Sequence, residues 1–144
     1  MKKIMIVDDN YLSAEGIEKN IDWETLNAEI IHVCYNGTSA IEAMKKEPVD
    51  LIISDIEMPD LDGISMSRQA LEINPMVKII LISAYDKFEY ARRALLLGAL
   101  DYIEKPLDYA YLIQKVKNAF ALMEKEQKNL QLLKQSRPLL TEKF

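Results

Sequence analysis

Five polar side chains of this 144-residue sequence are of types that could handle a metal ion and a phosphate together. They are the carboxylates of Asp8, Asp9 and Asp55, the hydroxyl of Ser83 and the ammonium group of Lys105. Three carboxylates brought together repel one another, so such a cluster is costly unless it binds a cation or shares a proton. Mg²⁺ is often held by one or two carboxylates plus phosphate oxygens. A carboxylate beside that ion can attack phosphorus, while a hydroxyl and a lysine stabilise the phosphoryl oxygens.

The segments that precede these side chains have the pattern of buried strands. Unbroken apolar runs are typical of strands covered on both faces of a parallel sheet, and they occupy residues 4–7, 51–53 and 79–82. Weaker strand candidates are residues 30–34 and 101–103. Apolar residues with helical spacing lie between the strands, at residues 39–46, 64–73 and 88–97. The alternation predicts a doubly wound α/β sheet with right-handed crossovers, whose ligands bind beyond the carboxyl ends of the strands.

Four segments at the ends of these strands also match a known family. They are residues 6–10 (IVDDN), 54–63 (SDIEMPDLDG), 81–84 (LISA) and 101–106 (DYIEKP). In this order and spacing, over residues 2–117, the sequence resembles the receiver domains of two-component response regulators. The resemblance implies a flavodoxin-like α/β fold, a five-stranded parallel sheet in the order 2-1-3-4-5 with helices on both faces. It also implies a signalling role, rather than that of an enzyme, with a sensor histidine kinase as phosphoryl donor.

The resemblance implies a role for each acidic residue of the cluster. Asp55 is the expected phosphoacceptor. Asp9 and Asp55 are the expected direct ligands of Mg²⁺, together with the backbone carbonyl of Glu57, and Asp8 is expected to act through a metal-bound water. The bland alternative is that residues 8–10 cap the first helix, because Asp and Asn are good N-caps.

The remaining matched positions are implied to bind the phosphate or to respond to it. Lys105 is the expected partner of the phosphoryl group, and its peptide bond to Pro106 is expected to be cis. Ser83 is the expected switch hydroxyl, and Tyr102 the aromatic side chain that turns inward when Ser83 moves. Each has an ordinary alternative, as a helix cap for Ser83, a half-buried strand residue for Tyr102 and a solvated surface lysine for Lys105.

The chain continues as a helix beyond the matched region. Its uninterrupted helical pattern runs from Tyr109 to about Gln135, and Pro138 is expected to break or kink it. A seam with four-three spacing indicates a short coiled coil. Its members are Val116, Ala119, Met123, Glu126, Leu130 and Leu133. We therefore divide the sequence into a receiver domain at residues 1–120 and a helical linker at residues 121–144.

A narrower resemblance concerns the output. Residues 21–24 (IDWE), 83–91 (SAYDKFEYA) and 137–144 (RPLLTEKF) resemble regulators that carry an AraC-type helix-turn-helix domain. This resemblance implies control of transcription, with DNA bound only through an output domain that this sequence lacks. The expected partners are a sensor histidine kinase and, on phosphorylation, a second copy of the chain.

Composition excludes several other classes. The net charge of −5 and a pI near 5.0, without any lysine- or arginine-rich block, do not suit direct binding of nucleic acid. Cys34 is the only cysteine, so a reducing compartment is expected. The N-terminal apolar run is too short for a signal peptide, and no stretch is long enough to span a membrane, so we expect a cytoplasmic protein.

Two other functions remain open at the level of the sequence. One is a stand-alone single-domain regulator that acts by binding another protein. The other is a metal-dependent phosphatase with an aspartyl nucleophile, in which Glu57 would be the second acid two residues after Asp55. The Asp-x-Asp arrangement usual for such phosphatases is absent, and no glycine-rich nucleotide-binding loop is present.

Overall fold

A parallel sheet of five strands forms the centre of the chain. The computed structural model describes residues 1–84 and 88–142. The strands are β1 (Lys2–Val7), β2 (Ala28–Cys34), β3 (Leu51–Asp55), β4 (Lys78–Ser83) and β5 (Asp101–Glu104). Their order across the sheet is β2-β1-β3-β4-β5. The five predicted strands and their predicted order are therefore confirmed.

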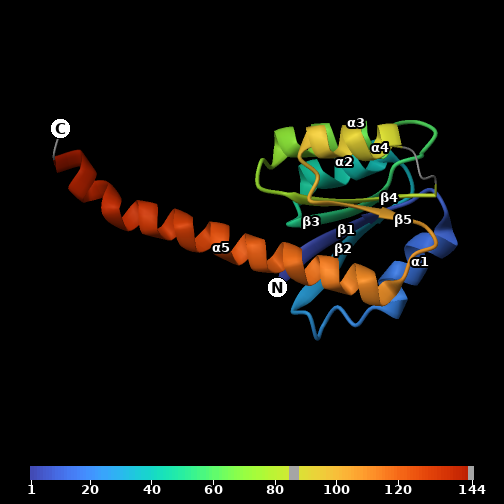
Figure 1. Ribbon diagram of the computed structural model, residues 1–144, viewed down its shortest axis with the longest axis horizontal. Coiled ribbons are helices and arrows are strands. Elements are labelled where there is room, and N and C mark those ends of the chain that lie inside the picture. The colour runs from blue at the N-terminus through green and yellow to red at the C-terminus, as the bar shows by residue number, and fades with distance from the viewer. Residues whose placement is uncertain (85–87, 143–144) are drawn as a thin grey trace.

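Helices cover both faces of the sheet (Figure 1). One face is covered by α2 (Gly37–Lys46), α3 (Gly63–Ile73) and α4 (Phe88–Leu97), and the other by α1 (Tyr11–Asn20) and α5 (Tyr109–Glu142). Successive side chains of a strand point to opposite faces, so the central strands contribute to both cores. Met5 and Ile52 pack beneath α2 and α3, whereas Ile6 and Ile53 pack beneath α1 and α5. This double burial explains why the strands read as unbroken apolar runs.

Polar side chains fix where three of the helices begin. Asn10, Asn36 and Asp62 are the N-caps of α1, α2 and α3, and each accepts a hydrogen bond from a backbone N–H of the first turn. The cap of α1 is thus Asn10, and the side chains of the two acids before it are left for other contacts. Asp60 stabilises α2 from a distant loop, accepting from the backbone N–H groups of Gly37 and Thr38.

Helix α5 extends well beyond the rest of the molecule (Figure 1). At 1.5 Å per residue its 34 residues span about 50 Å. Of the two outcomes expected at Pro138, the break is wrong, because the helix continues past this residue to Glu142. Proline in a helix interior removes one hydrogen bond and crowds the carbonyl of the preceding turn, a cost that need not end a long helix. None of the helices in residues 1–84 and 88–142 is long and apolar enough to cross a membrane.

The base of α5 is fixed to the sheet, and its continuation is exposed. Val116 and Ala119 of the predicted seam are buried against the receiver core. The Glu126 carboxylate pairs with the Lys78 ammonium of β4 at 2.8 Å, which ties α5 to the sheet. Beyond it, Leu130 is 48% exposed. The seam predicted as a coiled coil therefore packs within its own domain as far as Glu126.

Candidate functional site

The candidate residues meet at one edge of the sheet because the parallel strands end in register. Val7 of β1 lies beside Ser54 of β3, and Asp55 lies beside Ile82 of β4. Ser83 at the end of β4 pairs in register with Glu104 of β5. The loops after β1 and β5 then add their own polar residues to the same edge. The carboxyl ends of neighbouring parallel strands thus bring together residues that are far apart in the sequence.

Three carboxylates form the centre of this site. Oxygen atoms of Asp8, Asp9 and Asp55 lie within 4.8 Å of one another. Asp8 is 3% exposed and Asp55 is 8% exposed, whereas Asp9 faces solvent. Hard oxygen donors at this spacing, open to solvent on one side, suit a divalent cation that keeps part of its water shell. The donor set therefore fits the metal ion that the sequence predicts.

One lysine partly balances the three acids. The Lys105 Nζ atom lies 3.5 Å from Asp55 Oδ2 and 3.6 Å from Asp8 Oδ2, so it is shared between the two buried carboxylates. The peptide bond between Lys105 and Pro106 is cis, as the resemblance implies. With three carboxylates and one ammonium group, the ionised cluster keeps an excess of two negative charges, which a divalent cation would neutralise.

Burial and mutual repulsion change the acidity of these groups. Burial raises the pKa of Asp55 to about 6, and although Lys105 opposes the rise, Asp8 and Asp9 add to it. Burial also raises the pKa of Asp8 above its ordinary value. Both effects have the same origin, because a carboxylate removed from water and placed beside like charges resists ionisation. The fold thus disfavours ionisation of Asp8 and Asp55, and a bound cation would favour it.

The loop after β3 presents Asp55 through close backbone packing. The Ile56 N–H donates to Asp55 Oδ1 at 3.0 Å, and the Gly63 N–H donates to the Ile56 carbonyl at 2.8 Å. A Cβ atom at Gly63 would lie only 2.1 Å from the Asp55 carbonyl oxygen. Only glycine can therefore begin α3 this close to the acidic residue, which gives this glycine a positioning role that the sequence pattern did not reveal.

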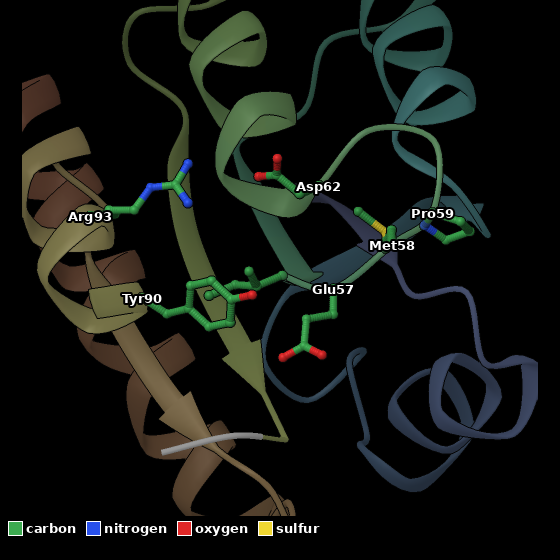
Figure 2. Close-up of a pocket in the computed structure, with 7 residues that line it drawn as sticks. Glu57, Met58, Pro59, Asp62, Tyr90 and Arg93 are labelled. Carbon is green, nitrogen blue, oxygen red and sulfur yellow. The ribbon is translucent and has the colours of Figure 1, made fainter. Parts of the chain in front are cut away.

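The two predicted switch residues lie on adjacent strands. Ser83 is fully buried, and its hydroxyl donates to Glu57 Oε1 at 3.4 Å. Tyr102 is half-buried on β5 and packs against the core beneath α2, α3 and α4. The Glu57 side chain lines a cavity of about 400 Å³ that also contacts Asp62, Tyr90 and Arg93 (Figure 2). Nothing in the sequence pattern indicates the contact between the Glu57 side chain and Ser83, because the two residues are 26 positions apart.

Two side chains of reactive types, His32 and Cys34, lie outside the acidic cluster. The only histidine, His32, contacts the Glu47 carbonyl oxygen at 2.9 Å on the outer strand β2. Cys34 is buried and forms no disulfide. Tyr85, Asp86 and Lys87, which carry part of the resemblance to AraC-type regulators, lie outside the described residues.

Comparisons with known proteins agree with this arrangement. The family model for the response regulator receiver domain matches residues 4–117. The transcriptional regulatory protein YesN of Bacillus subtilis is 29% identical over 88% of this chain, and CheY of Treponema pallidum is 34% identical over 79% of each protein. The chain spans only 34% of the length of YesN and 44% of that of HptR from Staphylococcus aureus.

Solved structures share both the fold and part of the sequence. The receiver domain of AraT from Geobacillus stearothermophilus superposes with a TM-score of 0.82 and 35% identity, covering 88% of this chain and 98% of that one. A chain of the CheX–CheY–BeF₃–Mg²⁺ complex from Borrelia burgdorferi superposes with a TM-score of 0.75 and 29% identity, covering 83% and 89%. The fold is thus common to this chain and a group of bacterial signalling proteins.

Proposed function

The chain belongs to the response regulator receiver domain family, whose members are signalling domains rather than conventional enzymes, and from this premise we propose that Asp55 accepts a phosphoryl group from a sensor histidine kinase. One observation carries the proposal. A buried carboxylate at the end of β3 lies within 4.8 Å of two other acids and 3.5 Å from a lysine ammonium group. A purely structural carboxylate gains nothing from two like charges at this range, whereas a phosphoryl acceptor needs both the cation site and the lysine.

The chemistry follows from the position of each side chain. An oxygen of the Asp55 carboxylate attacks phosphorus, so that a new O–P bond replaces the P–N bond of a phosphohistidine and the leaving imidazole keeps the electron pair. Lys105, already at the Asp55 carboxylate, is placed to pair with the phosphoryl oxygens. The Ser83 hydroxyl at the end of the neighbouring strand is a second donor for the same oxygens.

We assign Mg²⁺ to the acidic cluster. Asp9 and Asp55 would hold the ion directly, with the backbone carbonyl of Glu57, and Asp8 would act through a bound water. When bound, Mg²⁺ supplies positive charge that offsets the carboxylates and the phosphoryl oxygens. Support comes from the Borrelia complex, a relative whose structure is named for BeF₃ and Mg²⁺.

The output that we propose is control of transcription. Relatives such as YesN and HptR are named transcriptional regulatory proteins and are more than twice as long as the matched region. Residues 1–120 would be the receiver and residues 121–144 a helical linker to an AraC-type DNA-binding domain. Phosphorylation would shift an existing equilibrium between two forms, with Ser83 and Tyr102 as switch residues, and favour pairing with a second copy.

A stand-alone regulator is the second candidate, since CheY of Treponema pallidum matches this chain over 79% of its own length. The long projecting part of α5 favours the first candidate, because an isolated helix of this kind is marginally stable in water without a partner or further domain.

Intact-protein mass after incubation with Mg²⁺ and phosphoramidate tests the proposal. We expect one added phosphoryl group in the wild type, none in Asp55→Asn and none after removal of Mg²⁺. Asp22→Asn, the same chemical change in an exposed turn, is the matched control and should be modified like the wild type. A folded, Mg²⁺-binding wild type that gains no mass would refute phosphorylation at this site.

A further inference from the structure

The hydroxyl of Ser83 contacts the side chain of Glu57, an acid in the loop that follows β3 and the phosphoacceptor. Ser83 has no solvent exposure, and its Oγ donates to Glu57 Oε1 at 3.4 Å. Glu57 lies two residues beyond Asp55 and lines the cavity beside α4, with its carboxylate directed away from Asp62 and Arg93 (Figure 2). This contact joins the loop after Asp55 to Ser83, the last residue of β4.

That contact competes with the proposed function, on which the following inference rests. A serine hydroxyl has one proton to donate, so it cannot donate to Glu57 and to a phosphoryl oxygen at once. We propose that Glu57 is a positioning residue that holds the Ser83 hydroxyl in the unphosphorylated domain and must release it before Ser83 can bind the phosphoryl group. At 3.4 Å the hydrogen bond is long, so it biases the hydroxyl without locking it.

The released carboxylate needs a new partner, because a phosphoryl dianion nearby repels it. Among the residues that line the cavity, Arg93 of α4 is the only cation. Within residues 1–84 and 88–142, Arg93 forms no ion pair, whereas its neighbour Arg92 lies 3.8 Å from Glu89 on the outer surface. Arg93 is therefore the group to which Glu57 moves, and the movement connects the acceptor loop to α4.

The affinity of the Mg²⁺-loaded protein for BeF₃⁻, a phosphoryl mimic, gives a thermodynamic test by titration calorimetry. We expect Glu57→Ala to raise this affinity about two- to five-fold, the range set by one weak hydrogen bond. In a Ser83→Ala background the same change should have no effect, because Glu57 acts through the hydroxyl. Glu57→Gln keeps an acceptor oxygen and should raise the affinity less than Glu57→Ala.

Simple charge repulsion predicts a different pattern. If Glu57 only repels an incoming anion, Glu57→Ala and Glu57→Gln will raise the affinity equally, and the increase will persist without Ser83. Either result would overturn the proposal, as would an unchanged affinity. Glu72→Gln, which removes an exposed carboxylate of α3, is the control for net charge and should match the wild type.

The role of Arg93 is tested with the same titration. Arg93→Met should lower the affinity for BeF₃⁻ about two- to five-fold in the wild-type background and leave it unchanged in Glu57→Ala. Arg92→Met is the matched control, because its side chain is 61% exposed and pairs on the outer face of α4. A loss that is equal with and without Glu57 would assign Arg93 to direct anion binding and refute the movement.

A further measurement separates this inference from the proposed function. Three-bond couplings report the χ1 rotamer of Ser83 in the unphosphorylated protein, where no phosphoryl chemistry is involved. We expect one rotamer in the wild type and rotamer averaging in Glu57→Ala. A single rotamer in both would overturn the role of Glu57 even if Asp55 is phosphorylated, and a protein that takes neither phosphoryl nor BeF₃⁻ could still show the averaging.

Discussion

Replacing Asp55 by asparagine, in protein kept free of divalent cations, should raise the free energy of unfolding at neutral pH. Asp55 is 8% exposed, and its pKa is about 6 in the fold compared with an ordinary value of 3.8. Each pKa unit corresponds to about 1.4 kcal/mol of interaction that differs between the two protonation states. The ionised carboxylate therefore destabilises the fold by up to about 3 kcal/mol, and an asparagine of nearly the same shape does not carry that charge.

The pH dependence follows from the direction of the pKa shift. Below about pH 4 the Asp55 carboxyl is protonated in both the folded and the unfolded chain, so the charge contributes nothing. Between about pH 4 and pH 6 the folded state retains a proton that the unfolded state has lost, and this contribution to stability decreases as the pH rises. Above about pH 6 the penalty is fully present. The advantage of Asp55→Asn should thus grow from near zero at pH 4 to its full value at pH 7.5.

Urea unfolding of both proteins at four pH values between 4 and 7.5, with a chelator present, measures this difference. Added Mg²⁺ should stabilise the wild type by mass action and reduce the advantage of the variant at pH 7.5. Asp22→Asn serves as the control and should show no pH-dependent difference from the wild type. If Asp55→Asn is less stable than the wild type at pH 7.5, or if its advantage is the same at pH 4, the buried-charge account of the site is wrong.

Three further changes test other parts of the site and its support. Lys105→Met should slow modification by phosphoramidate about 100-fold, the scale for losing one charge-stabilising donor, with circular dichroism unchanged; a smaller than two-fold effect would refute the role of Lys105. Gly63→Ala should lower the free energy of unfolding by about 3 kcal/mol, against about 1 kcal/mol for Gly98→Ala, where φ is +92° and no atom lies within 4 Å; equal losses would contradict the close approach. Lys78→Met should increase hydrogen exchange in α5 around Glu126 and cost less than about 1 kcal/mol of stability; unchanged exchange would mean that the ion pair does not anchor α5.

The sequence was sufficient for the parts of the fold that depend on short-range patterns. The apolar runs at residues 51–53 and 79–82 identified the central strands, because side chains buried on both faces leave no polar alternation. Once the strands were known, the position of Asp55 and Lys105 at their carboxyl ends placed the two residues together. The metal cluster was accessible to the same reasoning, since parallel strands in register end at one edge of the sheet.

Contacts between segments far apart in the sequence could not be predicted from the periodicity of apolar residues. The carboxylate of Asp60 caps α2 through the N–H groups of Gly37 and Thr38, a contact that nothing in the local sequence around Asp60 indicates. The seam of α5 was extrapolated at constant spacing, although its member Glu126 pairs with Lys78 of its own domain. In each case a charged side chain reaches a partner more than 20 positions away, and periodicity carries no information about such pairs.

In the unphosphorylated site, both groups that would bind phosphate already contact acidic side chains. The Lys105 ammonium is shared between two carboxylates, and the Ser83 hydroxyl is held by Glu57. A phosphoryl group on Asp55 therefore does not meet free donors, because it must draw Lys105 from Asp8 and Ser83 from Glu57. The contact between Ser83 and Glu57 stabilises the resting form, so the switching equilibrium depends on an acid whose side chain does not bind phosphorus. Replacing Glu57 should raise affinity for the phosphoryl mimic while leaving the acceptor intact, which distinguishes control of the switch from the chemistry of the site.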